Sequence, residues 1–186
     1  MTGINPPATP ATQSAPVPAP VPAPARLETG QAAPDFTLPS DTGDTVTLSA
    51  LHGKNIILYF YPAAMTPGCT TEACDFRDNL ARLSSRGFTV FGVSKDRLDK
   101  LVRFRERDHL TFPLLSDPDL TAHRLYGAYG EKKLYGKVRE GVIRSTFVID
   151  GDGVIRVARY NVRAKGHVDS LLRALDKLDD QERVRR

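Results

Sequence analysis

Residues Tyr59 to Phe76 read YFYPAAMTPGCTTEACDF, and this stretch decides the fold. An apolar, strand-like run from Ile56 to Tyr61 leads into it, and Pro62 ends that run. Thr66-Pro67-Gly68 has the composition of a turn. From Cys69 onward the apolar residues recur with the period of a helix. The pattern therefore predicts that a strand and a tight turn deliver Cys69 to the first turn of a helix.

A cysteine in the first turn of a helix is suited to thiolate chemistry. The unpaired backbone N–H groups and the helix dipole favour negative charge there, so a thiol ionises more easily. A free cysteine, with a pKa of about 8.5, is only about 3% thiolate at pH 7, so complete ionisation gains at most about 30-fold. Ionisation alone is not enough for a fast enzyme. The site must also stabilise a transition state.

Cys69 and Cys74 are the only two cysteines, and their spacing carries a second prediction. In one intact helix, a step of five residues places the two Cα atoms roughly 8–9 Å apart and about 140° around the axis. A disulfide requires a separation below about 7 Å and converging side chains. A bond between these cysteines therefore forms only if the first turns of the helix unwind.

The chain divides into a tail and one domain. Residues 1–26 form a Pro/Ala-rich tail, in which Pro6 to Pro24 contains eight of the 14 prolines and no aromatic residue. Such a segment cannot build a core and is predicted to be disordered. It lacks the basic start and unbroken apolar run of a signal peptide. Residues 27–186 are expected to form one globular domain, because 40% of the 186 residues are apolar.

Composition also limits the expected partners and compartment. No apolar run approaches the roughly 20 residues of a membrane span, so a soluble, cytoplasmic protein is predicted. Two cysteines in a reducing compartment are catalytic more often than structural. The net charge is +4, but the basic residues are dispersed and no nucleic-acid partner is expected. No cofactor or metal is expected, since the four histidines lack ligand spacing: His52, His109, His123 and His167.

The remaining pattern predicts an α/β fold. Strands are predicted at 35–38, 45–48, 56–61, 88–93, 113–115, 145–149 and 154–158. Helices are predicted at 69–85, 98–107, 119–126 and along 168–178. Gly127 to Lys137 is predicted to be an exposed basic loop. This order predicts a central mixed β-sheet flanked by helices, preceded by an N-terminal hairpin.

Several motifs together resemble the peroxiredoxins. Tyr61-Pro62 followed by TPGCT at 66–70, with Glu72 and Phe76, resembles their active-site signature. Cys74 resembles the second cysteine of the bacterioferritin-comigratory or Q-type subgroup, the atypical 2-Cys peroxiredoxins. The APDF, GEKKLYGK and RSTFVID segments at 33–36, 130–137 and 144–150 also look like that family, in the same order. The resemblance covers about residues 28 to 178.

The resemblance implies a thioredoxin-like fold and a thiol-specific peroxidase. Hydrogen peroxide and organic hydroperoxides would oxidise the Cys69 thiolate, the peroxidatic residue, to a sulfenic acid. Cys74 would resolve it as an intramolecular disulfide, which thioredoxin or a similar dithiol would reduce. Thr66 and Arg144 match the residues that position the thiolate and the peroxide oxygens, and Pro62 matches the residue that shields the pocket. A monomer is expected.

Some alternatives are open at this point. Glu72 has either a role in the site or only a favourable interaction with the helix dipole. A thioredoxin-like disulfide oxidoreductase would use the same helix start, but normally with two residues between its cysteines. A peroxide-sensing switch would use the same chemistry without turnover. Peroxide consumption with thioredoxin distinguishes both classes, and insulin reduction isolates the first.

Overall fold

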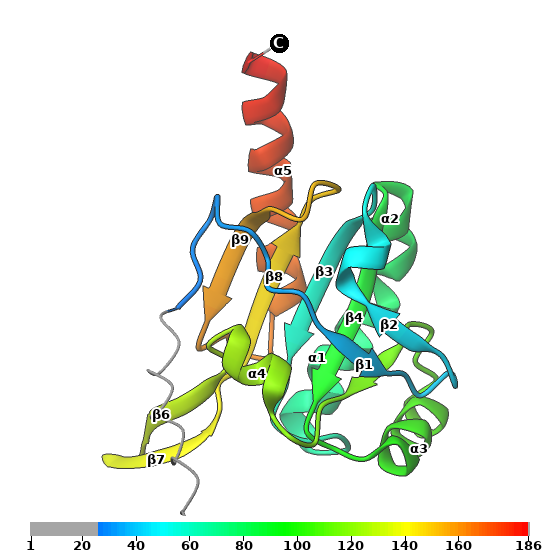
Figure 1. The fold of residues 1–186 in the computed structure, drawn as a ribbon, viewed down its shortest axis with the longest axis vertical. Coiled ribbons are helices and arrows are strands. Elements are labelled where there is room, and N and C mark those ends of the chain that lie inside the picture. Colours follow the sequence, from blue (N-terminus) through cyan, green and yellow to red (C-terminus); the bar gives the residue numbers. More distant parts are fainter. Residues whose placement is uncertain (1–25, 186) are drawn as a thin grey trace, which may run out of the picture.

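The computed structural model describes residues 26–185, and the predicted proline-rich tail, apart from Arg26, lies outside them. A central sheet of five strands, in the order β5-β4-β3-β8-β9, runs through the molecule (Figure 1). Its strands are β3 (Asn55–Phe60), β4 (Phe88–Ser94), β5 (Leu114–Ser116), β8 (Ser145–Ile149) and β9 (Ile155–Tyr160). The first three are parallel, whereas β8 runs antiparallel to both β3 and β9. The predicted mixed sheet is therefore present.

Helices cover the sheet, and two hairpins lie outside it. The helices are α1 (Pro67–Asp78), α2 (Leu80–Ser85), α3 (Leu98–Asp108), α4 (Thr121–Leu125) and α5 (His167–Arg185). The predicted N-terminal hairpin consists of β1 (Thr37–Pro39) and β2 (Thr45–Thr47), followed by a 3-10 turn, η1 (Leu48–Leu51). A second hairpin consists of β6 (Tyr129–Leu134) and β7 (Lys137–Val142).

Alternate residues of β3 enter two separate cores, as expected of a central strand buried on both faces. Ile57 and Tyr59 face a core that α1, α2, α3 and α5 complete. Leu58 and Phe60 face the other core, with β1, α4 and the segment around Phe36. In Figure 1, α5 and α1 lie behind the sheet, while β1 and α4 lie in front of it. The strand that leads to Cys69 is thus fixed from both sides.

Two local predictions were wrong. The helix predicted from Cys69 to Ser85 is two helices, because Asn79 interrupts it. The Asn79 side-chain amide donates to the Asp75 carbonyl at 2.9 Å, so a side chain takes part in the hydrogen bonding where the regular helix ends. The predicted loop from Gly127 to Lys137 instead contains the whole of β6 and the turn into β7. Its glycines and charges conceal the alternation that marks a strand.

Candidate active site

Cys69 is the third residue of α1, in the helix's first turn. Thr66 is the N-cap residue and Pro67 occupies the first helical position, where its missing N–H removes no helical hydrogen bond. The Thr70 N–H donates to the Thr66 carbonyl at 2.8 Å, which closes the first turn around Cys69. Only 2% of Cys69 is exposed. The predicted placement of this thiol at a helix start is confirmed.

Arg144 faces Cys69 across the carboxyl end of β3. Residue 144 directly precedes β8, and the β3–β8 register pairs Phe60 with Ser145. This pairing brings the Arg144 guanidinium to the start of α1, where its Nη2 donates to the Cys69 Sγ at 3.4 Å. Its Nη1 donates to the Glu72 carboxylate in an ion pair. One planar guanidinium thus connects the sulfur and a buried carboxylate.

Glu72 is a residue of this site, a point on which the sequence left two readings. Its side chain is fully buried. Burial raises the pKa of the Glu72 carboxyl from 4.5 to about 7, against the opposing effect of the Arg144 charge. Burial of the charged Glu72 carboxylate costs free energy. The carboxylate orients the Arg144 guanidinium through a charge-assisted hydrogen bond. The signal in the sequence is the three-residue step from Cys69, which places both side chains on one helix face.

Aromatic rings pack in the same core as Cys69. Tyr59 stacks on Phe76 of α1 with ring centroids 4.5 Å apart. A Cβ on Gly92 of the neighbouring strand would lie 2.9 Å from the Tyr59 hydroxyl, so only glycine leaves room for this phenol. Burial, with Tyr61, Glu72 and Cys69 close by, raises the pKa of Tyr59 well above its ordinary value. The Tyr59 phenol is therefore uncharged and contributes apolar surface next to the site.

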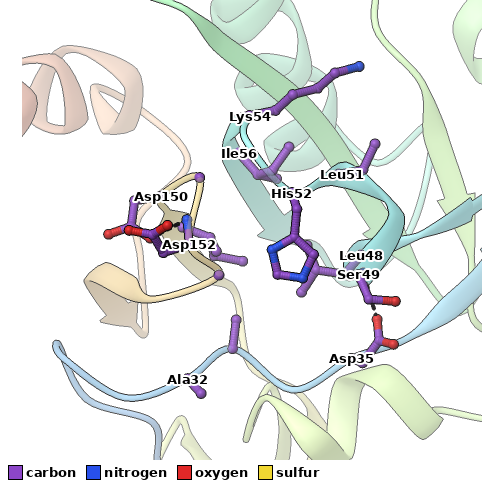
Figure 2. Close-up of a pocket in the computed structure, with 14 residues that line it drawn as sticks. Ala32, Asp35, Leu48, Ser49, Leu51, His52, Lys54, Ile56, Asp150 and Asp152 are labelled. Atoms are coloured by element: carbon purple, nitrogen blue, oxygen red, sulfur yellow. Dashed lines mark hydrogen bonds between the residues drawn. The ribbon is translucent and has the colours of Figure 1, made fainter.

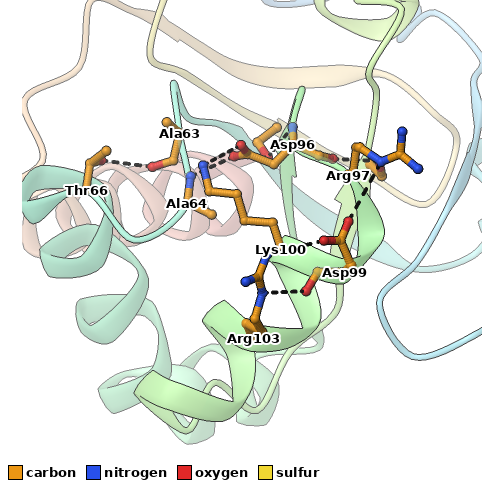
Figure 3. Close-up of polar contacts among 10 residues, drawn as sticks. Ala63, Ala64, Thr66, Asp96, Arg97, Asp99, Lys100 and Arg103 are labelled. Carbon is orange, nitrogen blue, oxygen red and sulfur yellow. Dashed lines mark hydrogen bonds and ion pairs between the residues drawn. The ribbon is translucent and has the colours of Figure 1, made fainter.

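The loop between β3 and α1 holds the other two predicted site residues. Pro62 is half-buried at its start. The Thr66 hydroxyl donates to the Ala63 carbonyl at 2.8 Å, which closes the loop on itself (Figure 3). Its oxygen lone pairs stay available as acceptors. The structure thus places Thr66 next to the helix start, with its proton directed into the loop.

Cys74 lies on the same helix as Cys69, and both thiols are free. Burial raises the pKa of the Cys74 thiol, and the carboxylates of Asp108, Asp78 and Asp75 act in the same direction against Arg77. Because α1 continues unbroken from Pro67 to Asp78, the helical geometry keeps the two sulfurs apart. The folded helix therefore holds Cys74 as a protonated, distant partner.

A separate cavity of about 220 Å³ lies at the other end of β3 (Figure 2). Its polar groups include Asp35, which accepts hydrogen bonds from the Ser49 and Phe36 N–H groups. Asp150 accepts from the Asp152 and Val154 N–H groups. Both carboxylates thus stabilise turns.

Within residues 26–185 no group of three histidine, cysteine or acidic side chains is arranged to hold a metal ion. In the same range, no helix is long and apolar enough to cross a membrane.

A buried thiol at a helix start, contacted by an arginine, is the arrangement of a cysteine that reacts as a thiolate. The AhpC/TSA family model matches residues 29–158. A putative peroxiredoxin of Mycobacterium tuberculosis strain H37Rv is 57% identical over 150 residues, covering 81% of this chain and 96% of that protein. Peroxiredoxin Bcp of Escherichia coli K12 is 42% identical over 146 residues, covering 78% and 94%.

Solved structures give the same assignment. The bacterioferritin comigratory protein of Xanthomonas campestris matches with a TM-score of 0.72 and 36% identity, covering 76% of this chain and 90% of that one. A cysteine-to-serine mutant of PrxQ from Xylella fastidiosa matches with a TM-score of 0.77 and 30% identity, covering 83% and 99%. The chain therefore belongs to the AhpC/TSA family, as a peroxiredoxin of the bacterioferritin-comigratory type. It is a thiol peroxidase, and the predicted thioredoxin-like α/β fold is confirmed.

Proposed function

We propose that Cys69 is the peroxidatic residue and that Arg144 stabilises the transition state of its oxidation. The thiolate attacks one peroxide oxygen, an S–O bond forms and the O–O bond breaks. The leaving hydroxide or alkoxide takes a proton and departs as water or alcohol, while Cys69 becomes a sulfenic acid. The observation that carries this proposal is the Arg144 guanidinium, which contacts the Cys69 sulfur and the buried Glu72 carboxylate together.

Arg144 is suited to this role because it is held before the reaction begins. As the O–O bond breaks, negative charge moves from sulfur to the leaving oxygen. A guanidinium already bound to Glu72 follows that charge without reorganising, which is the condition for effective electrostatic catalysis. We assign to Thr66 a contact with the peroxide through its hydroxyl, and to Pro62 the shielding of the pocket next to it.

For the second half of the cycle, we propose that Cys74 attacks the Cys69 sulfenic acid. Water is released and an intramolecular disulfide forms; a dithiol of the thioredoxin type then supplies two electrons to restore both thiols. The substrates that we propose are hydrogen peroxide and organic hydroperoxides. The Xanthomonas campestris relative supports the second class, since its alkyl peroxide reduction activity has been described.

We further propose that residues 27–186 are sufficient for catalysis and work as a cytoplasmic monomer, without nucleic acid or membrane. The reason for a monomer is that the arginine, the carboxylate and both cysteines come from one chain. Sedimentation of the reduced and oxidised protein at micromolar concentration tests this, because association in either state would contradict it.

The test of the function is steady-state consumption of peroxide coupled to NADPH through thioredoxin and its reductase. Wild-type protein should turn over, and Cys69→Ser should reduce turnover to the background rate. An insulin-reduction assay run beside it should be negative. Substantial peroxide turnover in Cys69→Ser would remove Cys69 from the mechanism. Insulin reduction at a comparable rate would identify a disulfide oxidoreductase instead.

A further inference from the structure

Asp96 lies where three loops meet at the carboxyl ends of β3, β4 and β5 (Figure 3). Its side chain is only 10% exposed. The Oδ2 atom accepts a hydrogen bond from the Ala64 N–H at 2.7 Å, and Ala64 belongs to the loop that leads to Cys69. A carboxylate from one strand end therefore holds the backbone of the loop that sets the position of the reactive thiol.

The loop that Asp96 holds is strained. Met65 has a φ of 65°, a conformation that a residue with a side chain rarely adopts and that costs on the order of 1 kcal/mol or more. Such a conformation persists only where the surroundings impose it. The bond from Asp96 to the Ala64 N–H lies directly before Met65 in the chain. On the other side, Thr66 is anchored by its bonds to the Ala63 and Thr70 backbone.

Asp96 is itself rigidly placed. The Ser94 hydroxyl donates to its Oδ2 at 3.0 Å, and the Lys100 ammonium donates to its Oδ1 at 2.7 Å. The Ser116 hydroxyl donates to its backbone carbonyl at 2.7 Å, which fixes it to β5. Lys100 also offsets the negative charge of this carboxylate. The carboxylate is therefore oriented and neutralised before it contacts the loop.

We propose that Asp96 is a positioning residue for the peroxide reaction: it fixes the loop at 62–66 and so aligns Cys69, Thr66 and the peroxide. It contacts the backbone of Ala64 and not the reacting atoms. This inference rests on the proposed function of Cys69. A displacement of about 1 Å at a reacting centre costs on the order of 100-fold in rate, so a loop anchor has a measurable effect on catalysis.

The experiment compares three substitutions of Asp96 with a matched control. Asp96→Ala removes the acceptor of the Ala64 N–H. Asp96→Asn keeps an oxygen in the same place without charge, whereas Asp96→Glu keeps the charge but moves it by one methylene. The control is Asp99→Ala, since Asp99 also pairs with a basic residue four positions on, Arg103, at 3.2 Å, and is exposed. Figure 3 shows both pairs: Asp99, Lys100 and Arg103 lie on α3, and Asp96 lies just before it.

Two rates are measured on the reduced protein: oxidation of Cys69 by hydrogen peroxide, followed by rapid quenching and mass spectrometry, and alkylation of Cys69 by iodoacetamide. Asp96→Ala should slow the peroxide reaction about 10- to 100-fold. Its alkylation rate should stay within about two-fold, because alkylation needs a thiolate but no alignment of peroxide oxygens. Asp99→Ala should match the wild type in both rates.

The peroxide rates of Asp96→Asn and Asp96→Glu, compared with each other, show whether the position of the side-chain oxygen or its charge is what matters. If position decides, Asp96→Asn reacts faster with peroxide than Asp96→Glu, and the comparison holds even if Asp96→Ala fails to fold. If Asp96→Glu equals the wild type and Asp96→Asn does not, the proposal is wrong. Equal peroxide rates in Asp96→Ala and Asp99→Ala would also overturn it, as would an equal fall in peroxide and alkylation rates. A wild-type Cys69 that peroxide fails to oxidise would instead overturn the proposed function.

Discussion

Arg144 contacts two side chains that compete for its positive charge. A nearby cation stabilises the Cys69 sulfur when it is ionised. The Glu72 carboxylate already neutralises part of the positive charge of Arg144. The planar guanidinium satisfies both because it donates through different nitrogen atoms in fixed directions. A lysine ammonium in the same place carries the charge but cannot reproduce this fork.

Arg144→Lys should therefore slow oxidation of Cys69 by peroxide by about 100-fold, the usual cost of losing one fixed donor to a developing negative charge. The measurement is rapid-quench kinetics of sulfenic acid formation. Thermal unfolding of the same variant is the control and should shift by only a few degrees. Oxidation at the wild-type rate would exclude Arg144 from the transition state.

Glu72 predicts a pH dependence of stability. Because burial raises the pKa of this carboxyl from 4.5 to about 7, the folded protein holds its proton more tightly than the unfolded chain does. The free energy of unfolding should therefore fall as pH rises from about 4.5 to about 7. Glu72→Gln has no such proton. The difference in the free energy of unfolding between the wild type and Glu72→Gln should change by up to about 3 kcal/mol across this pH range.

The measurement for Glu72 is urea unfolding of both proteins at pH 5 and pH 8. The wild type should lose stability relative to Glu72→Gln between these values. A constant difference would mean that Arg144 keeps Glu72 ionised throughout, and the raised pKa would be refuted.

At the scale of elements, α1 has two incompatible tasks. Folded, it presents Cys69 to Arg144; to bring Cys74 to the Cys69 sulfur, it must open. The break at Asn79 makes such an opening local, since α2 is a separate helix packed against β4. Opening also removes the burial that raises the pKa of the Cys74 thiol, so the resolving thiol becomes easier to ionise in the state in which it reacts.

Oxidation should therefore increase amide hydrogen exchange across residues 66–78, while residues 171–178 of α5 stay protected. Hydrogen-exchange mass spectrometry of the reduced and the disulfide form measures this. Cys74→Ser should still form the sulfenic acid but lose thioredoxin-linked turnover and over-oxidise more readily. Unchanged exchange in the oxidised form would mean that Cys69 is resolved in another way, most simply by a cysteine of a second molecule.

The C-terminal end of α3 holds α1 in its folded state. The Arg107 guanidinium donates to the Thr70 hydroxyl at 2.9 Å, and Arg77 donates to the Asp108 carbonyl at 2.6 Å. Arg107→Ala removes a contact worth about 1 kcal/mol, so α1 should open about five-fold more readily. Disulfide formation, followed by non-reducing mass spectrometry after one equivalent of peroxide, should speed up accordingly.

The control for Arg107 is Arg103→Ala, because Arg103 donates to the Asp99 carbonyl and carboxylate on its own helix. Arg107→Ala should also show less over-oxidation at a given peroxide dose, since Cys74 competes sooner for the sulfenic acid. If both variants form the disulfide at the wild-type rate, α3 does not control the opening.

At the scale of the molecule, the proline-rich segment should contribute nothing to the domain. Its composition cannot bury apolar surface, so removal of residues 1–25 should leave both the melting temperature and peroxide turnover unchanged. The truncation keeps Arg26, whose guanidinium lies over the Tyr160 ring at 5.0 Å, so that the test removes the proline-rich segment alone. Calorimetry and the coupled assay measure the outcome. A large loss of either property would show that this segment docks on the domain.

The sequence by itself determined the elements whose signals are local. A continuous apolar run marked β3, a helical period and a turn placed Cys69 in the first turn of α1, and the cysteine spacing excluded a disulfide in the folded helix. The tertiary structure decided the rest. Arg144 contacts Cys69 across 75 residues only because β8 pairs with β3, and it also pairs with the buried Glu72 carboxylate. The β6–β7 hairpin and the break at Asn79 also depend on hydrogen-bond partners that no periodicity specifies. Periodicity reports which face of a segment is buried, whereas pairing between distant segments sets which charges meet.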